Sequence, residues 1–236
     1  MKKVLIVDGK RTAIGKFNGT LKNINCATLG STVVRAMLET NHINPNDVEE
    51  VIIGNVLSAG QGQGIARQVQ ILTGIPVETC AYSVNMVCGS SMKAVINGVE
   101  TIRVGSKDCV IAGGVENMSQ SPYLVSSNVR RGTRMGDFNL IDGMIADSLT
   151  DAFSGNHMGI TAENLAEHYN ISRIEQDTYA FESQKKALCA IELGEFNEEI
   201  IPIEVNEKKE TIFFREDEYP NKMTSLEKLG GGKTCF

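Results

Sequence analysis

Apolar and polar positions alternate through the first half of the chain in a pattern that predicts strands and helices in turn. Short β-branched apolar runs suit buried strands at residues 3–7 ("KVLIV"), 51–56, 79–87 ("TCAYSVNMV") and 108–114 ("DCVIAGG"). Between them, residues 26–43 place Leu29, Val33, Ala36 and Met37 on one helical face. Apolar residues at helical spacing also predict a helix over residues 89–104. Strands that alternate with helices predict an α/β fold with a largely parallel sheet.

The pattern changes after residue 118. Residues 119–154 are loop-like, and the serine and glutamate of "SRIE" (172–175) then form a predicted capping box at the start of a long helix. Gly194 is expected to end this helix. The runs "EEIIPIEV" and "ETIFF" predict two short strands that form a hairpin. We therefore expect an α/β unit over residues 1–118 and a second, loop-rich unit over residues 119–236.

Composition and charge exclude several classes of protein. Apolar content of 42% and a mean hydropathy of -0.11 are typical of soluble globular proteins. A net charge of -6 argues against nucleic acid or an anionic membrane as the main partner. The apolar run near the N-terminus is too short for a signal peptide or a membrane span, so we expect a cytoplasmic protein. Six cysteines without a C-x-x-C pair argue against a disulfide framework and against structural zinc.

Two glycine-rich stretches have the wrong spacing for nucleotide sites. In "GQGQG" (60–64), neither register puts a third glycine where a dinucleotide loop needs it. In "GGGKT" near the end, the first glycine of a phosphate loop would fall on Glu227, and no helix follows. With three histidines and no G-x-S-x-G elbow, a serine triad is also disfavoured.

Cys88 is the strongest candidate for chemistry. In "NMVCGSSM" (85–92) it lies between a predicted strand and a predicted helix. The unpaired amides and the dipole of the first helical turn would favour its thiolate, which is the nucleophilic form. The same amides would stabilise the oxyanion of an attached acyl group. The alternative is a buried cysteine that acts as a small hydrophobic residue.

Several long peptides resemble the thiolase family, in particular its biosynthetic acetyl-CoA acetyltransferases. They include "NMVCGSSMKAV" (85–95), "VIAGGVENMSQSPY" (110–123), "KRTAIGKF" (10–17) and "HMGITAENLAEHYNISRIEQD" (157–177). The resemblance extends from Lys2 to about Leu229, and the tail from about residue 230 does not look like the family. It implies the family's first repeat, a mixed, largely parallel five-stranded sheet with flanking helices, and an inserted loop domain. The second repeat is expected to be absent.

The resemblance also implies the chemistry and the partners. The cysteine that matches Cys88 takes an acetyl group from acetyl-CoA, and a second acetyl-CoA then attacks to give acetoacetyl-CoA. Coenzyme A thioesters are the substrates, and no further cofactor is implied. The acyl and pantetheine site would include Leu149, His157 and Met158, and the CoA phosphates would lie near Asn221 and Lys222.

A cationic stretch, "VRRGTRMG", matches the family's oligomer loop. By composition alone its arginines indicate a solvated loop, an anion site or an oligomer contact. The resemblance favours the contact and implies a homo-oligomer, either a dimer or a tetramer. The arginines concerned are Arg130, Arg131 and Arg134.

This sequence also departs from the family's pattern. The Gly-His-Pro base and the second cysteine of a Cys-x-Gly-Gly-Gly motif are missing from it. Ser91, Met92 and Asn221 stand where relatives usually have glycine, a larger aliphatic residue and arginine. We therefore expect Cys88 to be alkylated readily while turnover is much weakened. The alternatives are a catalytically dead fragment that acts only as an interaction partner, and a condensing enzyme of the ketoacyl synthase type.

The missing second repeat has a predicted energetic consequence. The helix after Cys88 belongs to a layer that thiolase halves share, so one apolar face would lose its partner. Leaving four such side chains exposed forfeits on the order of 6 kcal/mol, at ~1.5 kcal/mol each. We expect the chain alone to be unstable, to dimerise through that surface or to aggregate.

Overall fold

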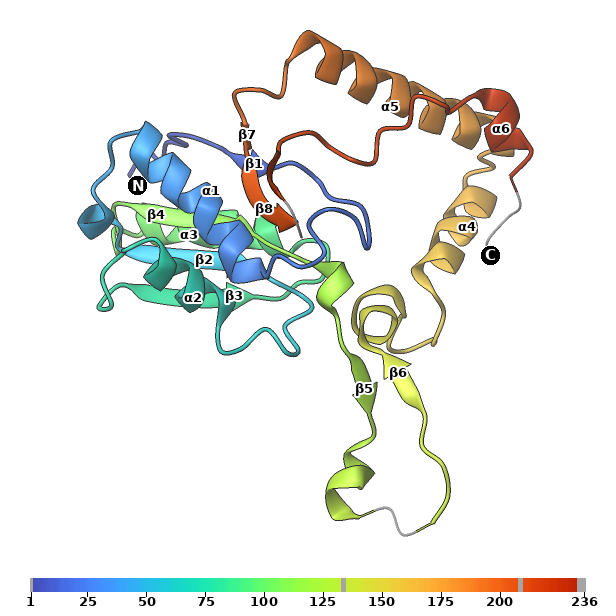
Figure 1. The fold of residues 1–236 in the computed structure, drawn as a ribbon, viewed down its shortest axis with the longest axis horizontal. Coiled ribbons are helices and arrows are strands. Elements are labelled where there is room, and N and C mark those ends of the chain that lie inside the picture. The colour runs from blue at the N-terminus through green and yellow to red at the C-terminus, as the bar shows by residue number, and fades with distance from the viewer. Residues whose placement is uncertain (1, 133–134, 208–209, 233–236) are drawn as a thin grey trace.

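A three-stranded parallel sheet forms the centre of the protein in the computed structural model, which describes residues 2–132, 135–207 and 210–232 (Figure 1). The strand order is β3-β2-β4, with β2 at Glu50–Gly54, β3 at Cys80–Val84 and β4 at Val110–Gly114. Glu50 pairs with Cys80 on one side and with Val110 on the other. All five residues of β2 are buried, as expected for the middle strand of a parallel sheet.

Helices cover both faces of this sheet (Figure 1). On one face, α1 (Cys26–Thr40) and α2 (Ile65–Leu72) pack against each other and against Val51, Ile53 and Ile111. On the other face lies α3 (Ser90–Arg103), which contacts all three strands. Its buried residues are small, namely Ser90, Ala94 and Gly98. Its apolar face lacks a partner, as predicted for a chain without the second repeat: Met92 is 69%, Ile96 41% and Val95 39% exposed.

The prediction of a buried strand at residues 3–7 was wrong. This segment has no secondary structure, and Leu5, Ile6 and Val7 are exposed. A strand needs a hydrogen-bonding neighbour, and none lies beside this segment in the described chain. The sheet accordingly has three strands and not the five that the resemblance implied. Further along, β1 (Arg11–Thr12) pairs in parallel with β7 (Ile200–Ile201).

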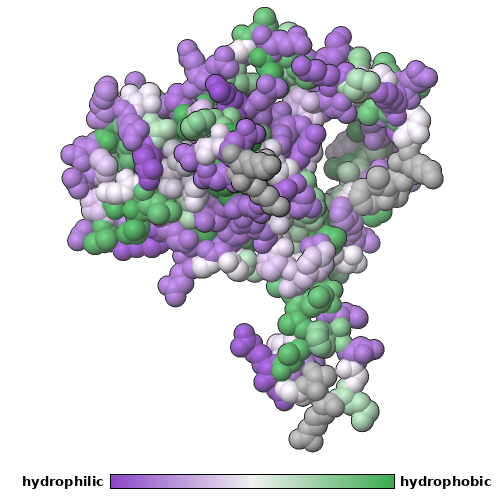
Figure 2. Space-filling model, viewed as in Figure 1, coloured by the Kyte–Doolittle hydropathy of each residue, from purple (hydrophilic) through white to green (hydrophobic). Residues whose placement is uncertain are grey.

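An arm and two long helices follow β4. In the arm, β5 (Tyr123–Val125) pairs antiparallel with β6 (Leu140–Asp142), and a π-helical turn spans Ile145–Leu149. Figure 2 shows apolar side chains gathered on this arm, where Tyr123 and Leu140 are exposed. The helices are α4 (Met158–His168) and α5 (Arg173–Leu193). The predicted capping box at Ser172 and Glu175 and the left-handed Gly194 at the end of α5 are confirmed.

The chain then returns to the α/β unit. The predicted hairpin is confirmed as β8 (Ile203–Glu207) paired antiparallel with β9 (Glu210–Phe214), and α6 (Leu226–Gly230) follows. Ile203, Val205 and Phe214 form a second core with Ala13, Leu21 and Leu29 from the first part of the chain. The two stretches that differ in sequence pattern therefore share a core.

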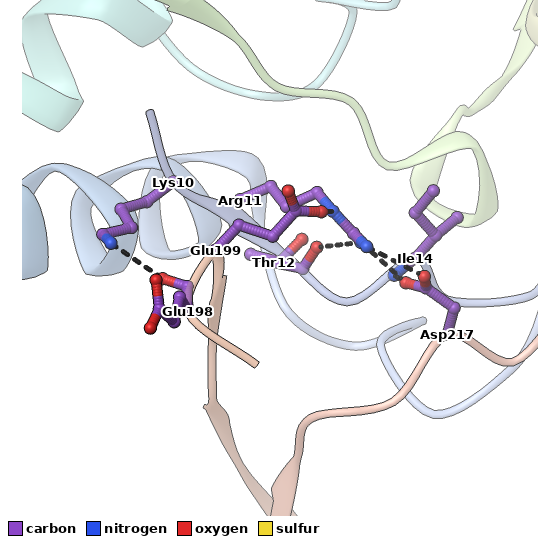
Figure 3. Close-up of polar contacts among 7 residues, drawn as sticks. All are labelled: Lys10, Arg11, Thr12, Ile14, Glu198, Glu199 and Asp217. Atoms are coloured by element: carbon purple, nitrogen blue, oxygen red, sulfur yellow. Dashed lines mark hydrogen bonds and ion pairs between the residues drawn. The ribbon is translucent and has the colours of Figure 1, made fainter. Parts of the chain in front are cut away.

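Arg11 also links the first part of the chain to the segment after α5 (Figure 3). Its Nε donates to Glu199 Oε1 at 2.6 Å, and its Nη1 and Nη2 donate to the two oxygens of Asp217 at 2.8 and 3.0 Å. Burial would raise the pKa of Asp217, but hydrogen bonds from Arg11 and the Ile14 amide outweigh it and lower that pKa. Bidentate arginine–carboxylate pairs are among the stronger ion pairs in proteins. Within the described residues, no helix is long and apolar enough to cross a membrane.

Candidate active site

Cys88 lies in a tight turn that leads from β3 into α3. The Gly89 amide donates to the Met86 carbonyl at 3.1 Å, and the Ser90 amide donates to the Val87 carbonyl at 3.0 Å. The Ser90 hydroxyl accepts from the Met86 amide at 2.9 Å and donates to the Val87 carbonyl at 2.5 Å. The sequence NMVCGSS thus closes a compact loop that fixes the cysteine just before the helix.

Val87 adopts a left-handed backbone with φ of 49°. A β-branched residue is rarely found there, because its Cβ crowds the following carbonyl, at a cost of roughly 1–2 kcal/mol. Strain of this kind persists where the surrounding contacts impose it, and it is concentrated at functional sites. The strained position directly precedes the exposed Cys88.

Two glycines let the head of α3 approach the end of the sheet. A Cβ placed on Gly54, the last residue of β2, would lie 2.5 Å from the Ser91 nitrogen. A Cβ on Gly114, the last residue of β4, would lie 2.6 Å from the Ser91 Cβ. Because neither glycine has a side chain, the start of α3 and the Cys88 turn before it can lie directly against the carboxyl ends of the strands. In open α/β sheets this is the edge at which ligands bind.

Cys88 lines a cavity of about 370 Å³. The wall combines the loops after β2 and β4, the head of α3 and the π-helical turn. The lining residues include Asn55, Leu57, Ser91, Glu116, Met118, Ser148 and Leu149. The cavity is therefore an open hollow of mixed polarity that a small acyl group and its thioester could enter beside the cysteine.

The backbone amides near Cys88 fall into two groups. Those of Gly89 and Ser90 are used by the turn itself, because they donate to carbonyls before the helix. The next two amides, of Ser91 and Met92, make no hydrogen bond within the described chain. The first turn of α3 therefore has unpaired donors on Ser91 and Met92, as its sequence position predicts.

Glu116 holds together another part of the cavity wall, and sequence reasoning did not single it out. Its carboxylate accepts from Asn55 Nδ2 at 2.9 Å, from the Val56 amide at 2.9 Å and from the Leu57 amide at 3.2 Å. Asn55 and Glu116 each follow a strand, β2 and β4, so the parallel sheet brings them to one edge. That pattern, a polar residue just after each apolar run, was visible in the sequence.

The other cysteine near this region has a different environment. Cys26 is fully buried at the start of α1. Burial, together with the charge of Glu116, raises the pKa of its thiol to about 11. At neutral pH Cys26 is therefore a neutral, packed thiol, while Cys88 is open to solvent. The sequence left two alternatives for Cys88, a nucleophile or a buried cysteine that acts as a small hydrophobic residue. Cys88 is exposed and therefore does not fit the second, whereas Cys26 does.

The structure brings only one of the other predicted acyl-site residues to Cys88. Leu149 lines the cavity, from the π-helical turn. His157 caps α4, and its Nδ1 accepts from the Gly159 amide at 3.0 Å. Met158 begins the same helix. Neither His157 nor Met158 is among the residues that line the Cys88 cavity.

The remaining predicted residues also lie away from that cavity. The Asn221 amide donates to Gln184 Oε1 at 2.7 Å, which holds the exposed Asn221–Lys222 stretch against α5. Arg130 and Arg131 are exposed in a 3-10 turn, Ser127–Arg131, beyond β5 on the arm. Arg134 lies outside the described residues. Within the part of the chain described, no three His, Cys, Asp or Glu side chains are placed to hold a metal ion.

Comparison with known proteins gives a consistent result. The model of the thiolase N-terminal domain matches residues 4–236, which includes the tail set apart in the sequence. An acetyl-CoA acetyltransferase of Pseudomonas aeruginosa is 48% identical over 237 residues, and one of Escherichia coli is 44% identical over 236. Each alignment covers all of this chain and 60% of the relative, so the chain spans about 60% of their length.

A solved structure agrees with these relatives. The crystal structure of the Bacillus anthracis acetyl-CoA acetyltransferase superposes with a TM-score of 0.92 at 36% sequence identity. The match covers 96% of this chain and 57% of that one. The strand–turn–helix unit that presents Cys88, the family match over nearly the whole sequence and this superposition lead to one conclusion: the chain belongs to the thiolase family.

Proposed function

We propose that Cys88 accepts an acetyl group from acetyl-CoA, as the first half of an acetyl-CoA C-acetyltransferase reaction. The observation that carries this proposal is the placement of Cys88. It is exposed, it follows a strained Val87, and it lines a cavity at the carboxyl edge of the parallel sheet. The relatives named acetyl-CoA acetyltransferase support the choice of substrate.

The proposed step is a transfer between two sulfur atoms. The Cys88 thiolate attacks the thioester carbonyl, the new carbon–sulfur bond forms, and the coenzyme A thiolate leaves and takes up a proton. The backbone amides of Ser91 and Met92, which make no hydrogen bond in the described chain, are candidate donors for the oxyanion that develops. Leu149 and Met118 supply apolar wall for the acetyl methyl group.

The second half-reaction needs a base to deprotonate a second acetyl-CoA. None of the residues that line the described Cys88 cavity is a histidine, and its carboxylate, Glu116, accepts three hydrogen bonds that hold two loops together. Proton transfer by a positioned group contributes ~100- to 10,000-fold. We therefore expect acetylation of Cys88 by this chain, but very slow formation of acetoacetyl-CoA or its thiolysis.

Assembly is part of the proposal. The arm carries exposed apolar residues along β5 and β6 and two exposed arginines at its tip. Exposed apolar surface of this kind marks an interaction site. We propose that the arm contacts a second copy of the chain in a homo-oligomer, and that His157, Met158, Asn221 and Lys222 approach coenzyme A only in that larger assembly.

Acetylation can be tested directly. The protein is incubated with acetyl-CoA, digested at low pH and mapped by mass spectrometry, and hydroxylamine release identifies a thioester. The acetyl group is expected on Cys88 and is expected to be lost in Cys88→Ser. Cys80→Ser is the matched control, because Cys80 is also exposed but does not line the cavity. Equal labelling of Cys80 and Cys88 would show mere surface chemistry and contradict the proposal.

A further inference from the structure

Three serines line the Cys88 cavity, and their hydroxyl groups differ in what they bind. The Ser90 hydroxyl is committed to the turn, where it both accepts and donates a hydrogen bond. The Ser148 hydroxyl donates to the Met144 carbonyl at 2.6 Å. The Ser91 hydroxyl makes no hydrogen bond with the residues that the structure describes, and Ser91 is exposed. Of the three, the Ser91 hydroxyl is therefore the one that a ligand in the cavity can use.

The amide side chain in the same wall is already engaged. Asn55 Nδ2 donates to the Val115 carbonyl at 3.1 Å and to Glu116 Oε1 at 2.9 Å. These two bonds fix the orientation of the amide group, and they leave its Oδ1 as a buried acceptor without a partner in the described chain. Asn55 therefore has no donor left for a ligand. Among the described lining residues, the Ser91 hydroxyl is the available oxygen or nitrogen donor on a side chain.

Ser91 is also held in a fixed place. A Cβ on Gly54 would lie 2.5 Å from the Ser91 nitrogen, and a Cβ on Gly114 would lie 2.6 Å from the Ser91 Cβ. The residue thus lies directly against the ends of two strands, and only the rotation about its Cα–Cβ bond moves the hydroxyl oxygen. A donor that is held in place in advance stabilises developing charge without reorganisation.

The position of Ser91 relative to the nucleophile suits an acyl group on the sulfur. Ser91 follows Cys88 by three residues, and the Ser90 amide donates to the Val87 carbonyl three residues back. In a helical turn, side chains three residues apart have Cβ atoms about 5–6 Å apart. Both residues line one cavity. The carbonyl oxygen of an acyl group on Cys88 would therefore lie within reach of the Ser91 hydroxyl.

We propose that the Ser91 hydroxyl donates a hydrogen bond to the acyl oxygen at Cys88, which makes Ser91 a catalytic residue of acetyl transfer. This inference rests on the proposed function and adds a residue to it. When the Cys88 thiolate adds to the thioester carbonyl, the electron pair of the C=O bond moves to oxygen. The hydroxyl stabilises that oxyanion and keeps its own proton. The pair then re-forms the carbonyl, the bond to the coenzyme A sulfur breaks, and the thiolate leaves.

Serine at this position departs from the glycine that the family resemblance implies. A glycine has no side-chain donor, so this contact would be particular to chains that carry serine here. The same substitution could instead crowd the thioester. The two roles predict opposite results for Ser91→Gly, because removal of a donor slows acetylation whereas removal of an obstacle accelerates it.

The test compares two reactions of the same sulfur in the full 236-residue chain. Acetyl-CoA produces an oxyanion when it acetylates Cys88, whereas iodoacetamide alkylates by displacement of iodide and produces none. In Ser91→Ala and in Ser91→Gly, the rate of acetylation should fall by at least about tenfold. The rate of alkylation should change by less than about twofold. Ser183→Ala is the control for both rates, because Ser183 is exposed on α5 and lies outside the cavity.

A spectroscopic measurement detects the contact itself. Acetyl-CoA labelled with ¹³C at the carbonyl gives a thioester on Cys88 whose infrared carbonyl band is lowered by a hydrogen bond. The band is expected at higher wavenumber in Ser91→Ala than in the unaltered chain.

Several results would overturn the inference. They are acetylation as fast in Ser91→Ala as in the unaltered chain, faster acetylation in Ser91→Gly, an equal fall in both reactions, and an unshifted carbonyl band. Recovery of the acetyl group on Ser91 would also overturn it, because the hydroxyl would then be an acyl acceptor. If the unaltered chain is not acetylated on Cys88 at all, the proposed function fails as well, whereas unimpaired acetylation of Ser91→Ala defeats only this inference.

Discussion

The substitution Gly54→Ala tests how the active-site turn is held against the sheet. The added Cβ would lie 2.5 Å from the Ser91 nitrogen and 2.6 Å from the Ser90 carbonyl carbon. Comfortable contact between such atoms begins near ~3.5 Å, so the head of α3 would have to move by roughly 1 Å. These are backbone atoms that no rotamer change can move aside. Overpacking of this kind typically costs about 1–3 kcal/mol.

The same displacement should impair the chemistry. Cys88 lies two residues before the first helical residue, so a shift of α3 moves the turn that carries the sulfur. Misplacement of a reacting group by roughly 1 Å can reduce a rate by ~100-fold. We therefore expect Gly54→Ala to lower both the free energy of unfolding and the rate at which acetyl-CoA acetylates Cys88. Urea denaturation followed by circular dichroism measures the first, and time-resolved mass spectrometry measures the second.

Gly113→Ala is the matched control. Gly113 lies in the neighbouring strand β4, and a Cβ placed on it would meet nothing within 4 Å. Its stability should change by no more than about 0.5 kcal/mol, as for a substitution without steric conflict. If Gly54→Ala and Gly113→Ala behave alike in both assays, the close approach of α3 to β2 does not hold the turn, and the reasoning fails.

Three further predictions concern the cysteines, the exposed helix face and the ion pair at the chain junction. Iodoacetamide at neutral pH should alkylate Cys88 and leave Cys26 unmodified, since Cys26 is fully buried with a pKa of about 11; peptide mapping that finds Cys26 labelled first would contradict the structure. Burial raises the pKa of Cys26 from 9.0 to about 11, so the neutral thiol contributes stability that is complete below pH 9 and is lost as the pH rises toward 11. The free energy of unfolding should fall by roughly 2–3 kcal/mol over that range. Cys26→Ala should lack this fall when unfolding is measured against pH. Met92→Glu should reduce self-association in analytical ultracentrifugation, because Met92 is 69% exposed on an unpartnered apolar face, and an unchanged monomer before and after would contradict that role. Asp217→Asn should remove the acid sensitivity that Asp217 confers: its pKa is lowered by Arg11, so its stabilisation is present above about pH 4 and is lost as the pH falls further, which acid titration of the two proteins would compare.

Local patterns predicted much of this structure. The capping box of α5, its terminal Gly194 and the β8–β9 hairpin follow from neighbouring residues, so a window of sequence contains all the information they need. Parallel strands β2, β3 and β4 and the helix after Cys88 were predicted on the same basis. The candidate nucleophile was also found, because its position depends only on a strand, a turn and a helix that are adjacent in sequence.

Errors arose where a partner lies far away in sequence. The run at residues 3–7 has the composition of a buried strand, yet it forms none, because no strand lies beside it. In α3 the periodicity correctly predicted a helix with an unpartnered apolar face, but it did not show that the face toward the sheet consists of small residues such as Ala94 and Gly98. Only small residues allow α3 to approach the strands so closely, and a Cβ on Gly98 would lie 3.2 Å from Val110 Cγ1.

The amino-acid sequence by itself determined the types of the main elements, the turn that presents Cys88 and the family to which the chain belongs. Tertiary structure alone decided which apolar residues are covered, that Glu116 and Asn55 line the same cavity as Cys88, and that the thiol of Cys26 is buried. The physical reason is the range of the interactions. Periodicity, capping and turn geometry act between residues a few positions apart, whereas burial and hydrogen-bond partners depend on which distant segments the sheet brings together.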